Sequence, residues 1–321
     1  MGSEQLSTAT EPTIPSLVDC GQSPVLVADM GGTRLRVALV SSEGEIISKE
    51  EHPTPKGGVH PEMLVNTLAS LAAVGEPVEA VVGVPGPIDY DEGALLWAPH
   101  LPPAWVGGLT SSALSESLGL SVSLANDADL ATVGECWFGA GREYGDVAYV
   151  TVSTGVGAGV VLRRRLVRGR RSLAELGHMV IETSSLWEAR PATVEELGSG
   201  SAIEARGRES NLGMSAADVA GLARAGSSEA QQIWRNAARY VAVGIHNLCL
   251  LFAPELVVLG GGVGRSEGFA DAVREEIFEV ASSGRSLGAE LAVAALGDDA
   301  GLVGGAGWLE ATSPQAWGSG R

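Results

Sequence analysis

The stretch from Val25 to Val40, VLVADMGGTRLRVALV, constrains the fold of this chain more than any other. A Val-rich run ends near Asp29, a turn of Gly31, Gly32 and Thr33 follows, and a second β-prone run leaves that turn. We expect a tight hairpin, because paired glycines allow the positive φ that such turns need. Glycine also lets backbone N–H groups close on an anion such as a phosphate, and Asp29 is placed to hold a hydrated Mg²⁺. The alternative is an ordinary hairpin whose aspartate only caps the turn.

A second copy of this arrangement favours the first interpretation. From Val147 the chain reads VAYVTVSTGVGAGVVLRRRLVRG, with a turn at Thr154–Gly155 between two β-prone runs. Each copy continues through a polar turn, at 42–44 and 163–165, into a third short strand. An internal repeat of this kind indicates two related halves. Two phosphate-type turns that face each other across a cleft are better explained by a nucleotide site than by coincidence.

The length of 321 residues predicts two domains, because one hydrophobic core rarely grows that large. We expect an N-terminal α/β domain over 24–124 and a C-terminal α/β domain over 125–310. The last helix either stays with the second domain or returns to the first. Residues 1–23 are rich in Ser, Thr and Pro and predict a disordered leader, and 311–321 predict a flexible tail.

The charge and the cysteines exclude several classes of protein. The net charge is −18 with only 21 basic residues, which argues against a nucleic-acid partner and against anionic membrane surfaces. No apolar run reaches membrane-spanning length, and the N-terminus lacks the basic-then-apolar order of a signal peptide. Cys20, Cys136 and Cys249 are widely spaced and form neither a zinc nor a disulfide pattern. We therefore expect a cytoplasmic protein with small-molecule ligands.

Hydrophobic spacing predicts alternating strands and helices between and after the two hairpins. Buried-strand runs lie at 78–84, 120–124, 256–259 and 292–296. Helical spacing covers 61–74, 109–118, 128–138, 215–225, 231–253, 267–280 and 300–310.

Asp127 stands where one of these strands meets a helix. The strand at 120–124 delivers Asn126 and Asp127 onto the start of the helix at 128–138. An acidic residue at a helix N-terminus commonly caps it, which is the structural interpretation. The functional interpretation is a general base at the carboxyl end of a strand, where open α/β sheets bind ligands.

An ordered set of short motifs resembles the ROK family of sugar kinases, repressors and related proteins. Each motif is weak alone, but seven in order, over about residues 25–310, are specific. They are Asp29–Thr33, Gly83–Pro87, Asn126–Ala128, Ser153–Gly157, Glu175–His178, Leu259–Val263 and Leu296–Leu302.

The resemblance implies an α/β, actin/hexokinase-like (ribonuclease H-like) duplicated fold, with two domains around a central cleft for ATP and a sugar, and a homodimer. Asp127 would be the general base that accepts the proton of the attacking hydroxyl, and Asp29 would hold Mg²⁺ through water. Phosphate contacts would come from Gly31, Gly32, Thr33, Arg34, Thr154 and Gly155, and adenosine contacts from Gly260, Gly261 and Gly262. Sugar contacts would come from Gly86, His100, Asn126, Glu175, His178 and Glu195.

The chain departs from the family pattern at three places. Many members carry a Cys-rich zinc motif after the Gly-His pair, but no cysteine lies between Glu182 and Glu195, so we predict no zinc site. His178 is then free to contact sugar or merely to pack. His100 stands where members often have asparagine, and Arg34 where they often have lysine.

These observations predict an ATP-dependent hexose kinase, with glucose to glucose 6-phosphate as the first candidate reaction. Kinases of N-acetylmannosamine or fructose are the nearest alternatives. A sugar-sensing repressor is disfavoured, because the polar residues before Val25 are too few for a DNA-binding domain. A catalytically silent sugar sensor conflicts with an intact Asp127 and two phosphate turns. The sugar, the oligomeric interface and the donor (ATP or polyphosphate) stay open at this point.

Overall fold

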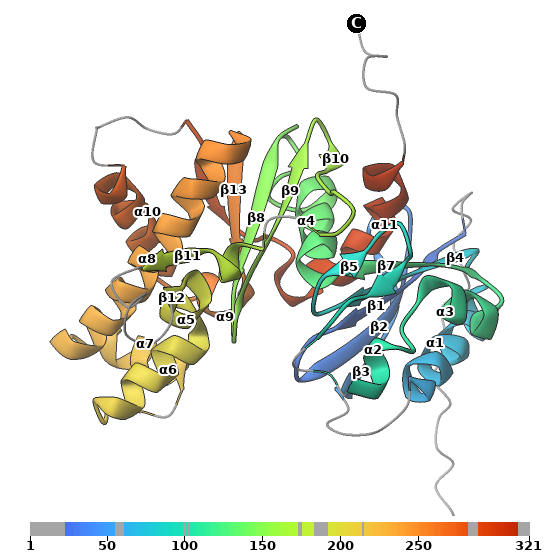
Figure 1. Cartoon of the computed structure of the whole chain (residues 1–321), viewed down its shortest axis with the longest axis horizontal. Helices are drawn as coiled ribbons and strands as arrows, with labels where there is room; N and C mark the ends of the chain where they lie inside the picture. The colour runs from blue at the N-terminus through green and yellow to red at the C-terminus, as the bar shows by residue number, and fades with distance from the viewer. Residues whose placement is uncertain are drawn as a thin grey trace, which may run out of the picture.

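A computed structural model describes residues 23–54, 61–98, 101, 103–172, 175–182, 192–213, 215–281 and 288–313. These residues form two five-stranded sheets, with helices outside and between them (Figure 1). Two small two-stranded sheets, β5–β6 (Ile88–Asp89, Ala94–Leu95) and β11–β12 (Val180–Glu182, Ala192–Thr193), lie on the connections.

The two large sheets have the same topology. In the first, β1 pairs antiparallel with β2, which pairs antiparallel with β3, and β4 and β7 add parallel strands on the other side of β1. In the second, β8, β9 and β10 form the same antiparallel set, and β13 and β14 add parallel strands beside β8. The duplicated fold expected from the two hairpins is confirmed. The strands are β1 (Val25–Met30), β2 (Arg34–Val40), β3 (Ile46–Pro53), β4 (Glu79–Val84), β7 (Ser121–Asn126), β8 (Val147–Val152), β9 (Val156–Leu162), β10 (Arg165–Leu166), β13 (Leu256–Gly260) and β14 (Glu290–Val293).

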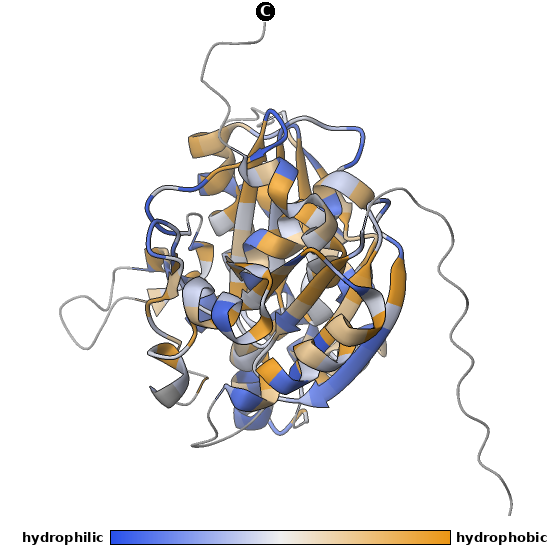
Figure 2. Ribbon diagram, turned by 90° about the vertical axis from the view of Figure 1, so that its right-hand side faces the viewer, coloured by the Kyte–Doolittle hydropathy of each residue, from blue (hydrophilic) through white to orange (hydrophobic). Residues whose placement is uncertain are grey.

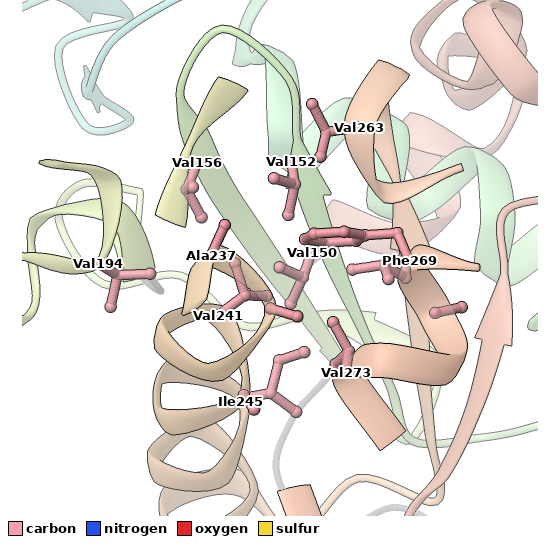
Figure 3. Close-up of a cluster of buried hydrophobic side chains, with 14 of the residues drawn as sticks. Val150, Val152, Val156, Val194, Ala237, Val241, Ile245, Val263, Phe269 and Val273 are labelled. Atoms are coloured by element: carbon pink, nitrogen blue, oxygen red, sulfur yellow. The ribbon is translucent and has the colours of Figure 1, made fainter. Parts of the chain in front are cut away.

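Helices cover the outer face of each sheet. Helix α1 (Glu62–Gly75) buries Leu64, Leu68 and Leu71 against the first sheet, with α3 (Ser111–Leu118) beside it and the short α2 (Pro103–Val106) nearby. The long α8 (Ser228–Phe252) and α10 (Phe269–Val280) cover the second sheet. Figure 3 shows their contact with that sheet, where the buried side chains are Val150, Val152, Val241, Ile245, Phe269 and Val273.

Two helices fill the space between the sheets. Helices α4 (Asp127–Phe138) and α11 (Ala300–Thr312) lie side by side there, and their apolar residues share one core with inner-face residues of both sheets. The two helices approach very closely at glycines: a Cβ on Gly304 would lie 1.9 Å from the Leu130 carbonyl oxygen, and one on Gly134 would lie 2.1 Å from that of Ala300. The last helix of the described chain therefore packs on the first sheet, against β1 and β2, as well as on α4.

The remaining elements lie after β10 in the chain. They are η1 (Leu176–His178), α5 (Val194–Gly198), α6 (Gly200–Glu209), α7 (Ala216–Arg224), α9 (Gly261–Gly264) and η2 (Gly297–Asp299).

One unpredicted helix and one strand end have identifiable reasons. Helix α6 was not predicted; its segment is polar and holds two glycines, and its start is fixed by Ser199, whose side chain accepts from the Ala202 N–H. The last strand ends at Val293 rather than at 296, because the buried Glu135 carboxylate takes the N–H groups of Ala295 and Leu296 out of the sheet.

Apolar residues concentrate on the inner strands and on the inward faces of the helices, while β3 at the edge of the first sheet is largely exposed (Figure 2). Within the described ranges, no helix is long and apolar enough to span a bilayer.

Candidate functional site

A pocket of about 910 Å³ is lined by residues of both halves of the molecule. Its walls come from the turns after β1 and β8, the loop after β4, the start of α4, and the segments around η1 and α5. The sequence-predicted site residues that it brings together are Gly31, Gly32, Thr33, Gly86, Asn126, Asp127, Thr154, Gly155, Glu175, His178 and Glu195.

The two hairpin turns present backbone N–H groups to this pocket. Among the described residues, the N–H groups of Gly32, Thr33, Thr154 and Gly155 have no hydrogen-bond acceptor, whereas the Gly31 N–H donates to the Arg34 carbonyl at 2.8 Å. Our expectation of positive φ at the paired glycines is wrong, because neither adopts the left-handed conformation. The lack of a side chain leaves open space in the pocket instead, since nothing lies within 4 Å of a Cβ built on Gly32. Such open N–H groups suit an anion.

Asn126 is the residue that caps α4. Its Oδ1 accepts from the N–H groups of Ala128 and Asp129 at 3.0 and 3.1 Å, and its Nδ2 donates to the Gly86 carbonyl at 3.0 Å. The capping alternative considered for Asp127 therefore applies to its neighbour. Asp127 accepts only from the Ala128 N–H, at 2.9 Å, and stands half-buried on the pocket wall.

The surroundings of Asp127 favour its neutral form. Removal from water raises its pKa to about 7, the negative charge of Asp29 adds to the rise, and the bond from Ala128 opposes it. A carboxyl that titrates near neutrality can exchange a proton with a ligand at physiological pH.

Asp29 lies behind the first turn, close to Arg36. Burial raises the pKa of Asp29, and the nearby Arg36 guanidinium opposes that rise. Arg36 Nη1 lies 3.8 Å from Asp29 Oδ2, since β1 and β2 pair these two residues in register. Room for the carboxylate comes from Gly301, where a Cβ would lie 2.9 Å from Asp29 Cγ. The oxygen donors of Asp29 and Asp127 fit the preference of Mg²⁺ for carboxylates.

The lining includes three polar side chains from segments that follow the second turn, those of Glu175, His178 and Glu195. Burial raises the pKa of Glu175, and the His178 charge opposes this rise. Glu195 Oε2 accepts from the Val156 N–H at 2.9 Å, so this carboxylate supports the second turn while it faces the pocket. The His178 ring lies 5.8 Å from that of Trp97, which reaches it from the first half.

Other predicted residues lie away from the lining. Arg34 is 62% exposed and pairs with Glu51 at 3.0 Å. The glycines from Gly260 to Gly262 start α9 beside the end of β8, where Gly261 has φ +79° and a Cβ would lie 2.4 Å from the Val152 carbonyl oxygen. His100 lies outside the described residues, as do residues 183–191, which hold most of the segment for which we predict no zinc site.

Sequence reasoning missed Arg36, Trp97 and Thr151, which line the pocket, and Asp129, which lies fully buried behind it. An opposite-charge pair across a hairpin was the available signal for Arg36, but the register was needed to use it. Asp129 accepts from the Tyr90 hydroxyl at 2.8 Å, and Tyr90 in turn accepts from the Asn126 N–H at 3.3 Å. No pattern in the sequence marks this pair.

Known proteins of similar sequence share this arrangement of segments. The model of the ROK family matches residues 25–312. The bifunctional enzyme NanE/NanK of Brucella melitensis is 35% identical, over 88% of this chain and 53% of that protein. The glucokinase of Halalkalibacterium halodurans is 30% identical (88% and 93% covered), and the N-acetylmannosamine kinase of Escherichia coli O6:H1 is 30% identical (78% and 87%). The chain thus spans about half the length of the bifunctional relatives it matches.

Solved structures agree in fold. The ROK hexokinase from Thermus thermophilus is 32% identical and superposes with a TM-score of 0.76 over 88% of this chain and 96% of the other. A ROK family glucokinase from Streptomyces griseus, in complex with glucose and AMPPNP, is 27% identical with a TM-score of 0.75, over 89% and 99%. The actin/hexokinase-like fold follows from these matches and from the two equivalent sheets. The chain belongs to the ROK family.

Proposed function

We propose that this chain is an ATP-dependent hexose kinase, with glucose as the first candidate substrate. The observation that carries the proposal is the position of Asp127. Its carboxyl lies on the wall of a pocket that is also lined by two turns with open backbone N–H groups and by the polar side chains of Glu175 and His178. A group transferred between a ligand held by the turns and a ligand held by these side chains would react in the pocket that Asp127 lines.

The sugar end has the chemistry that a hexose needs. A buried sugar hydroxyl requires a hydrogen-bond partner, and the carboxylates of Glu175 and Glu195 with the His178 ring supply acceptors and a donor. Trp97 and Leu101 add apolar surface to the lining, which suits the C–H face of a sugar ring. The similarity to a ROK glucokinase solved with glucose supports this assignment.

The phosphate end combines N–H donors with a metal-binding carboxylate. Gly32, Thr33, Thr154 and Gly155 would donate to phosphate oxygens, and Asp29 would hold Mg²⁺ through water. When bound, Mg²⁺ neutralises charge on the transferring phosphoryl group. We assign the adenosine to the glycines at the start of α9, from Gly260 onward, as the family resemblance implies.

The reaction then needs one proton acceptor. The sugar hydroxyl oxygen forms a bond to the γ-phosphorus while the bond from that phosphorus to the β–γ bridging oxygen breaks, and ADP leaves with the electron pair. The hydroxyl proton passes to the Asp127 carboxylate. Because burial holds the pKa of Asp127 near 7, its carboxylate is a stronger base than an exposed aspartate and is still substantially ionised at neutral pH.

N-acetylmannosamine is the second candidate substrate. The 30% identity to a bacterial N-acetylmannosamine kinase favours it. The apolar wall of Trp97 and Leu101 could accept an acetyl methyl group as well as a ring face.

A coupled ADP-release assay with Mg-ATP tests the proposal. The panel is glucose, mannose, fructose, N-acetylglucosamine and N-acetylmannosamine, and Asp127→Asn serves as the matched control protein. We expect turnover that depends on one hexose, and its identity separates the two candidates. Sugar binding by thermal shift without turnover on any sugar would contradict the kinase assignment, and repeating the assay with polyphosphate would test the other donor.

A further inference from the structure

The charges along the pocket are unbalanced for a nucleotide. Among the described residues that line it, Asp127, Glu175 and Glu195 carry acidic groups, and Arg36 is the one lysine or arginine. The whole chain has a net charge of −18. A polyanion such as ATP that enters this pocket therefore meets repulsion from the protein, and a cation in the wall would have a large effect on its affinity.

Arg36 is fixed in the wall but incompletely paired. Its side chain is 18% exposed, Nη1 lies 3.8 Å from Asp29 Oδ2, and Nη1 also donates to the carbonyl of Asp298 in η2. Its Nε is buried and has no hydrogen-bond partner in the described structure. A buried N–H without an acceptor is costly, and it shows that the local protein groups do not fully pair the guanidinium. Nη2 makes no hydrogen bond to the described residues and is not among the buried atoms, so it has donor capacity left for a ligand.

A purely structural role for Arg36 is the competing explanation. Burial of Asp29 requires a compensating charge, and Arg36 supplies it. However, the contact is a long, single-nitrogen one, whereas an arginine that serves only a carboxylate usually forms two parallel hydrogen bonds. The same fork also matches the oxygens of a phosphate.

We infer that Arg36 contacts the phosphate chain of the donor and is the main cationic determinant of nucleotide affinity in this pocket. The inference rests on the proposed function for the identity of the donor. It replaces Arg34, the residue that the family resemblance implied, because Arg34 is directed to Glu51 and lies off the lining.

Three substitutions separate these roles. Arg36→Gln removes the charge, Arg36→Lys keeps the charge without the fork, and Lys49→Gln is the matched control. Lys49 forms an ion pair with Asp299 of the same η2 segment and does not line the pocket. The Lys49→Gln variant therefore tests the contact with η2 alone. The readouts are the Kd of a fluorescent ATP analogue measured with Mg²⁺ and without sugar, the KM for Mg-ATP, the KM for sugar, and Tm.

We expect Arg36→Gln to raise the nucleotide Kd and the KM for Mg-ATP about 10- to 100-fold, as befits a lost charged hydrogen bond, with the sugar KM unchanged. Arg36→Lys should recover part of this loss, and Lys49→Gln should leave the nucleotide Kd unchanged. If Arg36→Gln does not fold, Arg36→Lys still tests the inference, because we expect its nucleotide Kd to rise while its Tm stays unchanged.

Two results would overturn the inference: a nucleotide Kd that is the same in both Arg36 variants and the wild type, or an Arg34→Gln variant with an equal or larger rise. Failure of the proposed function looks different. In that case the wild type binds the analogue, loses affinity on Arg36→Gln, and yet releases no ADP with any sugar.

Discussion

The two halves of this molecule share a scaffold but divide the chemistry unequally. Both contain an antiparallel three-stranded set followed by two parallel strands, and both direct a turn into the same pocket. In the first half, the hairpin pairs Asp29 with Arg36 across its strands. At the corresponding place in the second half, Thr151 pairs with Gly157, and neither residue is charged.

This difference indicates what each half contributes. Both turns offer N–H groups, so either can hold a phosphate oxygen. Among the described residues, the first half alone adds a carboxylate–guanidinium pair, Asp29 and Arg36, behind its turn. The second half instead supplies Glu175, His178 and Glu195 to the pocket lining. Helix α4, packed between both sheets, places Asp127 where the two contributions meet.

The largest expected effect comes from substitution of Asp127. Asp127→Asn keeps the side-chain shape but cannot accept the proton, so kcat should fall by roughly 10²–10⁴, the usual contribution of a general base. The sugar Kd from thermal shift or calorimetry should change little. A variant with nearly wild-type kcat would remove Asp127 from the mechanism.

A paired substitution tests the inequality of the two hairpins directly. Asp29→Asn should weaken the activating effect of Mg²⁺ by about 10- to 100-fold, because it removes the carboxylate that we propose to hold the ion through water. Thr151→Val, at the equivalent place in the second half, should leave the Mg²⁺ dependence within a few-fold of the wild type. Titration of initial rates with Mg²⁺ at fixed ATP measures both. Equal effects of the two substitutions would show that the halves hold the ion symmetrically.

The aromatic contact across the pocket offers a smaller test. Trp97 from the first half and His178 from the second lie with ring centroids 5.8 Å apart, and Trp97 is still 45% exposed. Trp97→Ala should raise the sugar KM about 2- to 10-fold, the scale of an aromatic contact, and leave the KM for Mg-ATP unchanged. Sugar-induced fluorescence change should also fall in Trp97→Phe. A rise confined to the KM for Mg-ATP would assign Trp97 to the nucleotide.

Asp129 on α4 provides a stability test with a defined pH dependence. It is fully buried, its Oδ1 has no partner in the described structure, and burial raises its pKa to about 7. Since the folded pKa exceeds the unfolded value, the stability linked to this group is present below about pH 4 and is lost as the pH rises through 7. The asparagine of Asp129→Asn can still accept the hydrogen bond from the Tyr90 hydroxyl but does not ionise, so this variant avoids the loss of stability.

We therefore expect Asp129→Asn to be more stable than the wild type at pH 8, by on the order of 1–3 kcal/mol, with a smaller difference at pH 5. Urea unfolding at the two pH values measures it. Tyr90→Phe is the control, because it removes the hydroxyl that donates to Asp129 and keeps the carboxyl. A variant equally destabilised at both pH values would contradict this account.

Much of the scaffold could be predicted from the chain itself. The two Gly-containing turns between Val-rich runs marked the duplicated sheets, and the strand-to-helix junction marked Asp127, because both signals are local in sequence. The roles of Arg36 and Trp97 could not be predicted, since Arg36 meets Asp29 only through the hairpin register and Trp97 meets His178 only when the two halves come together. The positive φ assigned to Gly31 and Gly32 failed because turn geometry depends on loop length, which the glycines alone do not determine.

The measurement that tests the central claim most directly is the pH dependence of kcat/KM for the sugar in the wild type. Asp127 must be ionised to accept a proton, and its removal from water raises its pKa to about 7. The account predicts that kcat/KM falls about tenfold per pH unit below 7, and that the residual activity of Asp127→Asn lacks this limb. A profile that stays flat from pH 8 to pH 5, or a limb that persists in Asp127→Asn, would contradict the claim that this carboxylate takes the proton.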